Sequence, residues 1–429
     1  MLTLEILALL LERNIKFQIG EIMESIYNKK VAVIGLGYVG LPLAVEFGKE
    51  YSTIGFDINK LRVAELKESV DNTLECTTDE INSSKHLSFT SDLKDLAESN
   101  IYIVTVPTPI DKHKQPDLSP LINASKMISS VICKGDIVIY ESTVYPGATE
   151  EVCVPVIEEI SGLSFNEDFF VGYSPERINP GDKVNRLINI KKVTSGSDAK
   201  TAAIVDDLYS SIIKAGTFKA SSIKIAEASK IIENTQRDVN IALMNEFSMI
   251  FDKLGIDTKE VIEAASTKWN FIKLTPGLVG GHCIGVDPYY LVHKSESVGH
   301  IPDIMKSARQ INDSMASYKA SSFVKKMILN KIDVSNSKVL VLGITFKPDC
   351  PDIRNTKIVD LVSEFESYGI DVSVYDPHAN AAEVMNEYSV ALVDEDSLSQ
   401  SFDVIIQAVN HSEFLEYNFQ KSSSLYLSI

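Results

Sequence analysis

The chain has few cysteines for its 429 residues. There are five, at positions 76, 133, 153, 283 and 350, and no two of them form a CxxC pair. Because the number is odd and the positions are scattered, a disulfide framework and a cysteine-based zinc site are both excluded as the basis of the fold. We therefore expect a protein of a reducing compartment, the cytoplasm, with no metal.

Positive charge is also scarce. The 41 Lys and Arg are outnumbered by 59 Asp and Glu, which gives a formal net charge of -18. A nucleic-acid partner or an anionic membrane surface calls for a basic face, so neither is expected here. An anionic ligand would have to be held locally, by helix N-termini and a few well-placed cations.

Long apolar runs are missing too. The apolar stretch from Ile6 to Leu11 lies between two glutamates, and no run approaches the roughly 18 residues that a membrane span needs. The start also lacks the basic region and the cleavage site of a signal peptide. We interpret residues 1–28 as an N-terminal extension, either a short helix or the product of an upstream start codon, with Met23 as the true start.

A glycine pattern follows this extension directly. The segment KVAVIGLGYVG combines a strand, a tight turn and the start of a helix, and its glycine turn contains Gly35, Gly37, Tyr38, Val39 and Gly40. The first glycine permits the turn, the second lets backbone amides approach a pyrophosphate, and the third packs the helix on the strand. This context predicts a dinucleotide-binding domain.

Asp57 closes the next strand and indicates which dinucleotide binds. Its carboxylate would accept hydrogen bonds from both ribose hydroxyls and repel a 2′-phosphate, so NAD is favoured over NADP. The alternative is a solvated carboxylate at a strand end. Arg62 joins the expected cofactor contacts, and Thr108, Thr143 and Glu176 follow later strands of the same α/β pattern, where ligands of parallel sheets bind.

Helical spacing dominates the middle of the chain. In the segment 223–255, Lys230 and Asn234 share one helix face, and Arg237 lies one turn further along. This face is either a solvated stripe or part of a site, since a buried lysine needs a partner or a function. The apolar residues around it predict a helix that is buried on most sides and that forms a homodimer: Ile231, Ile232, Ile241, Leu243, Met244 and Phe247.

A second α/β pattern begins near Lys338. It repeats the first, with Asp376 at the end of its second strand, but it has only Gly343 where the first pattern has three glycines. We expect a second nucleotide, held through Lys347 and Arg354, although a purely structural lobe is the alternative. The predicted fold is α/β, with two Rossmann-like doubly wound domains (29–214 and 319–429) joined by a central helical domain (215–318).

The segment GGHCIGVDPYY places Cys283 among glycines, where a ligand can approach its thiol. Oxidation of an alcohol to an aldehyde needs no cysteine. A thiolate becomes useful when oxidation continues, because it adds to the aldehyde, the adduct loses a second hydride, and water cleaves the resulting thioester. The sequence thus predicts Cys283 as the covalent nucleophile of a four-electron oxidation.

Several long motifs together resemble one family. They are GLGYVG, VPTP, STVYPG, SPERINPGD, AEASKIIENTQRDVNIALMNE, GGHCIGVDPYYL and ITFKPDCPDIRNT. From Lys30 to about His411 the chain is similar to the UDP-glucose/GDP-mannose dehydrogenase family. Within it, the sequence resembles the UDP-N-acetylhexosamine 6-dehydrogenases of bacterial surface polysaccharide synthesis, of the Vi-antigen type. The resemblance implies a UDP-sugar substrate, UDP-GlcNAc or UDP-GalNAc, with UDP-glucose and UDP-ManNAc as alternatives.

The resemblance also implies residue roles. Cys283 is the nucleophile, and Lys230 and Asp287 are the polar pair around the reacting oxygen. Asn234 is a substrate or oxyanion ligand, Glu176 is the base for thioester hydrolysis, and Thr143 positions the water. Further implied contacts are with the substrate at Arg177, Arg237, Gly280 and Lys347, and with the cofactor at Thr108, Thr143 and Arg354. His282 is interpreted as structural.

The segment SPERINPGD bears on the sugar. Arg177, Ile178, Asn179 and Pro180 stand where UDP-glucose oxidisers of the family have an apolar pair and an acidic residue, and we expect the change to accommodate a 2-acetamido group. The segment KLTPG (273–277) and the ending QKSSSLYLSI depart from the family pattern. Two other functions remain open, a two-electron β-hydroxyacid dehydrogenase and a non-catalytic nucleotide-sugar binding protein.

Overall fold

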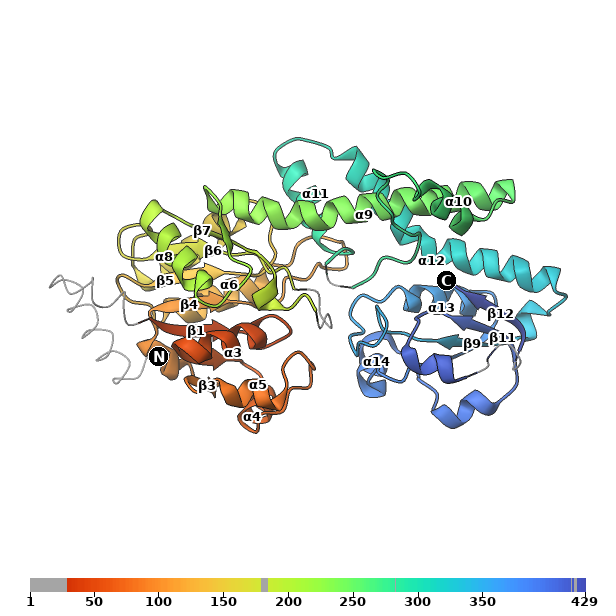
Figure 1. Ribbon diagram of the computed structural model, residues 1–429, viewed down its shortest axis with the longest axis horizontal. Helices are drawn as coiled ribbons and strands as arrows, with labels where there is room; N and C mark the ends of the chain where they lie inside the picture. The colour runs from red at the N-terminus through yellow and green to blue at the C-terminus, as the bar shows by residue number, and fades with distance from the viewer. Residues whose placement is uncertain (1–28, 179–183, 282, 418, 420–422) are drawn as a thin grey trace. The chain divides into compact units, whose positions relative to one another are not determined.

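The computed structural model describes residues 29–178, 184–281, 283–417, 419 and 423–429. Two compact units divide the chain: residues 1–232 with 289–294, and residues 233–288 with 295–429. Each unit contains one sheet (Figure 1). The predicted N-terminal extension 1–28 lies outside the described residues, as do His282, Asn179 and Pro180.

The first unit is built on an eight-stranded sheet of order β3-β2-β1-β4-β5-β6-β7-β8. All neighbouring strands are parallel except β6 and β7. The strands are β1 (Lys30–Ile34), β2 (Ser52–Phe56), β3 (Leu87–Thr90), β4 (Ile101–Val104), β5 (Ile137–Tyr140), β6 (Phe170–Tyr173), β7 (Lys192–Gly196) and β8 (Thr217–Lys219). The helices are α3 (Gly40–Glu50), α4 (Lys60–Lys67), α5 (Thr78–Ser83), α6 (Ser119–Ser129), α7 (Val154–Ser161) and α8 (Ala199–Ser210), with the short turns η1 (Leu93–Glu98), η2 (Thr149–Cys153) and η3 (Leu187–Asn189).

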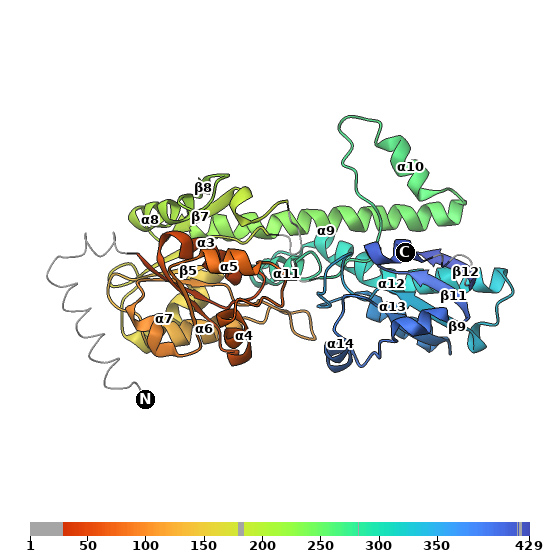
Figure 2. The same cartoon turned by 60° about the horizontal axis from the view of Figure 1, so that its bottom comes forward.

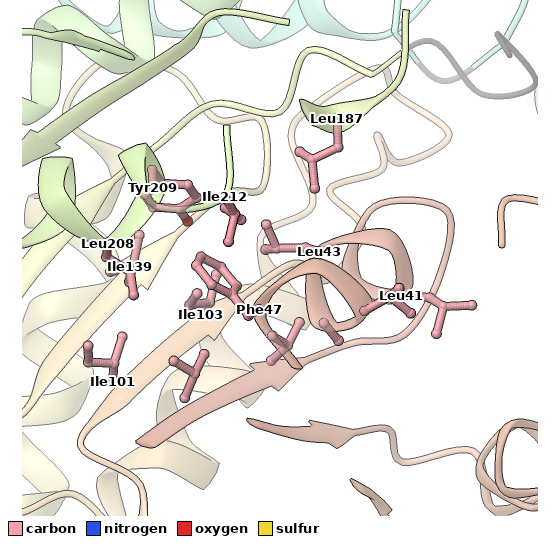
Figure 3. Packing of buried hydrophobic residues seen from close by; sticks show 14 of the residues in the cluster. Leu41, Leu43, Phe47, Ile101, Ile103, Ile139, Leu187, Leu208, Tyr209 and Ile212 are labelled. Atoms are coloured by element: carbon pink, nitrogen blue, oxygen red, sulfur yellow. The ribbon is translucent and has the colours of Figure 1, made fainter. Parts of the chain in front are cut away.

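Helices cover the sheet of the first unit on both faces. Phe47 of α3 and Tyr209 of α8 pack on Ile103 and Ile139 on one face (Figure 3). On the other face, the Tyr140 hydroxyl lies 2.7 Å from the Ser125 hydroxyl of α6. Because both faces are buried, the central strands are apolar throughout, as is typical of parallel sheets. The packing fixes the strand ends that carry the candidate site.

The second unit contains a four-stranded parallel sheet of order β10-β9-β11-β12. Its strands are β9 (Lys338–Leu342), β10 (Asp371–Tyr375), β11 (Phe402–Gln407) and β12 (Ser423–Ser428). The helices are α10 (Thr258–Ala265), α12 (Asp303–Leu329), α13 (Ile358–Ser367) and α14 (Ala381–Tyr388), with η4 (Val334–Asn336), η5 (Glu395–Ser399) and η6 (Ser412–Glu416). Helices α9 (Ile223–Leu254) and α11 (Asp287–Ser297) contribute residues to both units.

The core of the second unit has two sides. Helices α12 and α13 lie together beside this sheet (Figure 2). Phe323 of α12 and Phe365 of α13 stack at 6.4 Å and pack over Val341 and Ile406. The opposite face of the sheet is covered by the segments around η5 and η6. Near the unusual chain end, residues Ser423–Ser428 form β12, which pairs along β11 at the edge of this sheet. The predicted α/β class with two Rossmann-like sheets is confirmed.

Helix α9 differs from its predicted burial. Ile231 and Met244 are buried, but Ile232, Leu243 and Phe247 are exposed, so the prediction of a helix buried on most sides is wrong for a single chain. Leu243, Phe247, Ile250 and Leu254 recur every three or four residues and therefore line one exposed stripe. Among the described residues, no helix has the length and apolar content needed to cross a bilayer.

Candidate active site

The glycine turn after β1 has the geometry of a pyrophosphate cradle. Gly35 has a φ of +97°, which glycine adopts without strain. A Cβ at Gly40 would lie 1.8 Å from the Gly35 carbonyl oxygen, whereas a Cβ at Gly37 would meet nothing within 4 Å. The turn is thus closed where helix α3 packs and open at Gly37, where a ligand would approach.

Asp57 and Arg62 flank this turn. Asp57 Oδ2 accepts from the Leu36 backbone N–H at 2.9 Å and Oδ1 accepts from that of Asn59 at 2.8 Å, which leaves lone pairs for ribose hydroxyls. Arg62 Nε donates to the Leu36 carbonyl oxygen at 3.0 Å, and Nη2 pairs with Asp71 at 2.7 Å. Its Nη1 is buried and has no hydrogen-bond partner within the described part of the chain. These groups fit NAD, since a bound acceptor would satisfy that donor.

The loops after β4, β5 and β6 meet at the same edge of the sheet because these strands are adjacent and parallel. They carry Thr108, Thr143 and Glu176. The Ser142 hydroxyl donates to the Val106 carbonyl oxygen at 2.5 Å and so ties the first two loops together. The predicted positions along this edge therefore lie on adjoining loops.

A buried glutamate that the sequence analysis missed holds the loop of Thr143. Glu227 accepts from the backbone N–H of Gly147 at 2.5 Å and of Thr149 at 3.0 Å. Burial raises the pKa of Glu227 to about 7. Glu227 is 80 residues from Gly147, so no local pattern in the sequence connects them.

Glu176 belongs to a buried ionic cluster. Lys192 Nζ lies 2.9 Å from Glu176 Oε2 and 2.7 Å from Glu141 Oε2, and the Tyr209 hydroxyl donates to Glu141 Oε1. The other oxygen of Glu176 accepts from two consecutive backbone N–H groups, those of Arg177 and Ile178, each at 2.5 Å. The carboxylate of Glu176 is therefore fixed on both sides.

The two carboxyl groups of this cluster differ in pKa. Burial opposes ionisation of Glu176, but the Lys192 ammonium and the two backbone N–H groups outweigh it and lower the pKa. For Glu141, burial outweighs the attraction of Lys192 and raises the pKa to about 7. Glu176 therefore loses its proton at a lower pH than Glu141 does. Sequence reasoning missed Lys192 and Glu141.

In the second unit, the loop of Cys283 leads directly into α11. The Cys283 carbonyl oxygen accepts from the backbone N–H of Asp287 at 2.8 Å and of Val286 at 3.1 Å. The buried Asp287 carboxylate accepts from Asn234 Nδ2 at 2.5 Å. Three of the predicted residues, Asn234, Cys283 and Asp287, are therefore joined in one hydrogen-bonded group. Only Cys283 is partly exposed, whereas the other four cysteines are buried.

Two asparagines position the glycine-rich part of this loop. Asn245 of α9 accepts from the Gly277 N–H at 2.8 Å and donates to its carbonyl oxygen at 3.1 Å. The Asn355 carbonyl oxygen accepts from the Gly281 N–H at 3.2 Å, and a Cβ at Gly280 would approach it to 2.6 Å. The loop therefore requires glycine at this predicted substrate position.

The remaining predicted cations lie in different settings. Lys230 is buried, with 6% of its surface exposed. Arg177 Nη1 donates to the Lys191 carbonyl oxygen at 2.8 Å, and Arg237 is exposed. Arg354 Nε and Nη2 bind the Asp352 carboxylate at 3.0 and 2.7 Å. Lys347 Nζ lies 5.2 Å from the centre of the Phe346 ring.

The class of protein follows from three features: a glycine turn, a strand-end aspartate and a partly exposed cysteine. They are typical of a nicotinamide-dependent oxidoreductase that has a candidate thiol nucleophile. The chain belongs to the UDP-glucose/GDP-mannose dehydrogenase family. The family's NAD binding domain matches residues 29–213, its central domain 224–314 and its UDP binding domain 340–427. The family and the cofactor predicted from the motifs are confirmed.

Individual relatives cover nearly the whole chain. The chain is 60% identical over 385 residues to UDP-N-acetyl-D-glucosamine 6-dehydrogenase of Pseudomonas aeruginosa, covering 90% of this chain and 91% of that protein. It is 56% identical to the protein of the same name from Salmonella typhi, over 91% and 92%. Among solved structures, UDP-D-ManNAc dehydrogenase of Pyrococcus horikoshii is similar, with a TM-score of 0.84, 31% identity, and coverage of 93% and 94%.

The position of Asp57 yields a prediction about the cofactor. Asp57→Ala removes the acceptor for the ribose hydroxyls and the charge that repels a 2′-phosphate, so the preference for NAD over NADP in kcat/KM should fall by about tenfold or more. Asp207→Ala, at an exposed helix position, serves as the control and should keep the preference. Equal kcat/KM values for the two cofactors in the unaltered enzyme would contradict the role of Asp57.

Proposed function

We propose that the protein oxidises the C6 hydroxyl of UDP-N-acetylglucosamine to the carboxylate, for the synthesis of a surface polysaccharide. The names of the two relatives at 60% and 56% identity support this substrate, and UDP-N-acetylgalactosamine is the second candidate. The observation that carries the proposal is the loop of the partly exposed Cys283, whose backbone carbonyl is bonded to Asp287, the residue whose carboxylate Asn234 binds.

The first oxidation converts the C6 alcohol to an aldehyde. Asp287 accepts the hydroxyl proton, and the buried Lys230 stabilises the charge that develops on the oxygen. NAD, when bound, takes up the hydride in each of the two oxidation steps. Asn234 holds the oxygen by its amide while it also orients Asp287.

The second oxidation passes through Cys283. Its thiolate adds to the aldehyde carbon, forming a C–S bond, and the oxygen of the thiohemiacetal takes a proton. Loss of that proton and of the remaining hydride from C6 gives a thioester. Water then forms a new C–O bond while the C–S bond breaks, so the uronic acid leaves and the thiol is restored.

Glu176 acts in the hydrolysis of the thioester. It is ionised because Lys192 and two backbone N–H groups stabilise its charge, so it can accept a proton from the attacking water. Thr143, on the adjoining loop, positions that water. The Glu141 side of the cluster keeps Lys192 in place, which makes Lys192 and Glu141 positioning residues rather than reacting groups.

Further proposals concern the ligand contacts, the assembly and the location of the protein. Arg177, Arg237 and Lys347 contact the UDP-sugar, and Arg354 contacts the cofactor. The exposed stripe of Leu243, Phe247, Ile250 and Leu254 on α9 supports a homodimer, because such a continuous apolar stripe is costly to leave in water. The enzyme acts in the cytoplasm, where nucleotide sugars and NAD are both at hand.

The thioester step predicts a change in stoichiometry. The unaltered enzyme should release two NADH for each sugar, whereas Cys283→Ala should lose formation of the acid by several orders of magnitude. Cys133→Ala, which removes a buried thiol, should keep both the rate and the ratio. Quantifying NADH and uronic acid together checks this, and a Cys283 variant that retains a tenth of the acid production would rule out the covalent route.

The loop of Arg177 predicts sugar selectivity. A pocket built for a 2-acetamido group leaves polar groups unpaired when a 2-hydroxyl binds, at a cost of roughly 1 to 3 kcal/mol. UDP-GlcNAc or UDP-GalNAc should therefore exceed UDP-glucose by about tenfold or more in kcat/KM. A steady-state comparison of the three sugars at saturating NAD tests this. If UDP-glucose matches or exceeds both acetamido sugars, the interpretation of the loop is wrong.

The ionic cluster predicts a pH effect. Replacing Lys192 alone would leave the carboxyl groups of Glu141 and Glu176 without their shared cation. The test therefore uses the double variant Lys192→Met with Glu141→Gln, which removes the lysine and one of the two carboxyl groups together. Because the pKa of Glu176 is lowered by Lys192, it should rise in this variant, and the acid limb of uronic acid release in a single turnover should move to higher pH. Below that limb, protonated Glu176 no longer accepts a proton.

Two single variants serve as references for the pH effect. Lys192→Arg keeps the positive charge, so its pH profile of uronic acid release should stay close to that of the unaltered enzyme. Lys191→Met removes a neighbouring lysine whose side chain is exposed and should leave the profile in place. An unchanged acid limb in the double variant would mean that Lys192 does not control the ionisation of Glu176.

A further inference from the structure

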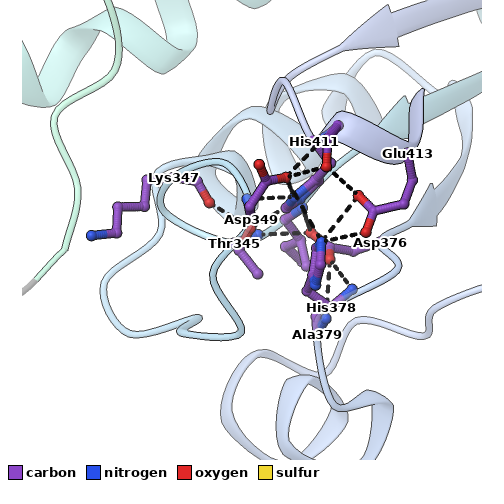
Figure 4. Close-up of polar contacts among 10 residues, drawn as sticks. Thr345, Lys347, Asp349, Asp376, His378, Ala379, His411 and Glu413 are labelled. Carbon is purple, nitrogen blue, oxygen red and sulfur yellow. Dashed lines mark hydrogen bonds and ion pairs between the residues drawn. The ribbon is translucent and has the colours of Figure 1, made fainter. Parts of the chain in front are cut away.

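A cluster of metal-ligand side chains lies on the second unit, apart from the groups assigned above. The loops that follow β9, β10 and β11 bring together Asp349, His378, His411 and Glu413 (Figure 4). One potential ligand atom from each of the four lies within 4.8 Å of all the others. Because the three strands are adjacent and parallel, their loops meet at the carboxyl edge of the sheet, where ligands of such sheets bind.

The distances within the cluster are close to those around a tetrahedral cation. Metal–ligand bonds of about 2.0 to 2.2 Å place the ligand atoms roughly 3.3 to 3.6 Å apart. Both carboxylate oxygens of Glu413 lie 3.1 Å from His378 Nε2, and Asp349 Oδ1 lies 3.9 Å from His378 Nε2 and from His411 Nδ1. The separations fall on both sides of the ideal range, so binding a cation would need small side-chain movements and the exchange of the hydrogen bond from the Asp349 backbone N–H to His411 Nδ1 for the cation.

His411 is held in the tautomer that a metal requires. It is buried, and its Nε2 lies 3.0 Å from Asp376 Oδ2 and 3.1 Å from Thr345 Oγ1. The same Asp376 oxygen also accepts from the backbone N–H of Ile344 and Thr345. An ionised carboxylate only accepts, so Nε2 carries the hydrogen and the lone pair is on Nδ1, toward Asp349. Its present donor is the Asp349 backbone N–H at 3.0 Å. A carboxylate behind the ligating histidine is usual at metal sites.

The charges of the cluster favour a cation. Asp349 and Glu413 each contribute a carboxylate to the cluster. Their ion-pair partners in the described part of the chain are the two histidines, with no Lys or Arg. Lys347, on the same loop as Asp349, extends away from the cluster (Figure 4). With Asp376 behind them, three carboxylates gather here without a fixed positive charge.

We propose that Asp349, His378, His411 and Glu413 bind one divalent transition-metal cation of the zinc type. Two imidazole nitrogens and two carboxylate oxygens form a ligand set that suits zinc, whereas magnesium and calcium prefer oxygen alone. The cation would join the loops after all three strands and balance their carboxylates. The site requires neither NAD nor a UDP-sugar, so the test of zinc binding does not depend on whether the proposed function is correct.

Calorimetric titration of the chelator-treated full chain with zinc chloride tests the proposal. The unaltered protein should bind one zinc per chain at this site and no magnesium under the same conditions. His378→Ala and Glu413→Gln should each weaken zinc binding by at least about 100-fold. Loss of a residue that only orients a metal ligand already costs up to about 100-fold, and loss of a ligand itself should cost no less. His411 is left intact because it is buried and bonded to Asp376.

Two controls separate this cluster from other zinc ligands. His300→Ala removes an exposed histidine elsewhere and should leave the affinity unchanged, and Cys283→Ser should leave it unchanged because the thiol is not a ligand. Thermal melting of the metal-free variants checks that each one folds. Absence of zinc binding to the unaltered protein, equal binding by His378→Ala and Glu413→Gln, or loss of binding in Cys283→Ser would each overturn the proposal.

Discussion

Both sheets depend on the parallel pairing of their strands, and the candidate sites follow from it. Parallel strands need crossover connections, so every loop that follows a strand emerges at the same edge. In the first unit this edge collects the glycine turn after β1, Asp57 after β2 and Glu176 after β6. Residues more than 100 positions apart in the sequence thus belong to one row of loops, each fixed by a strand that is buried on both faces.

Strand ends alone would leave these loops free to move, and buried polar groups from distant segments hold them. Glu227 binds two backbone N–H groups beyond Thr143, and Lys192 fixes Glu176. Within the second unit, Asn245 holds both backbone groups of Gly277 in the same way. Each of these side chains is buried, so breaking its bonds would leave a polar group unsatisfied inside the protein. Each unit therefore orders its own candidate loops by interactions that are costly to lose.

The sequence predicts the parts of the site that have local signals. The glycine turn and Asp57 lie within one βαβ segment, and Cys283 stands out because glycines surround it. The residues that hold the loops carry no such signal, because Lys192 is 51 residues from Glu141 and their pairing appears only when β5, β6 and β7 align. The burial of α9 was predicted wrongly for a related reason: spacing shows which residues share a face, but not which face is covered.

The two sheets show how one backbone arrangement supports different chemistry. Gly35 and Gly343 have similar φ values, +97° and +93°. After each glycine, the backbone N–H donates a hydrogen bond to the aspartate that follows the next strand, Asp57 in the first sheet and Asp376 in the second. Helix α3 begins at Gly40 directly after the first turn, whereas after the second turn α13 begins only at Ile358.

The missing helix start changes what the second sheet can bind. Without it, no N-terminal amides of a helix follow the Gly343 turn at once to receive a pyrophosphate. Asp376 is also buried and bonded to His411, so it is not available for ribose hydroxyls as Asp57 is. An anionic ligand at the second sheet therefore has to be met by side-chain cations or by a bound metal rather than by the backbone.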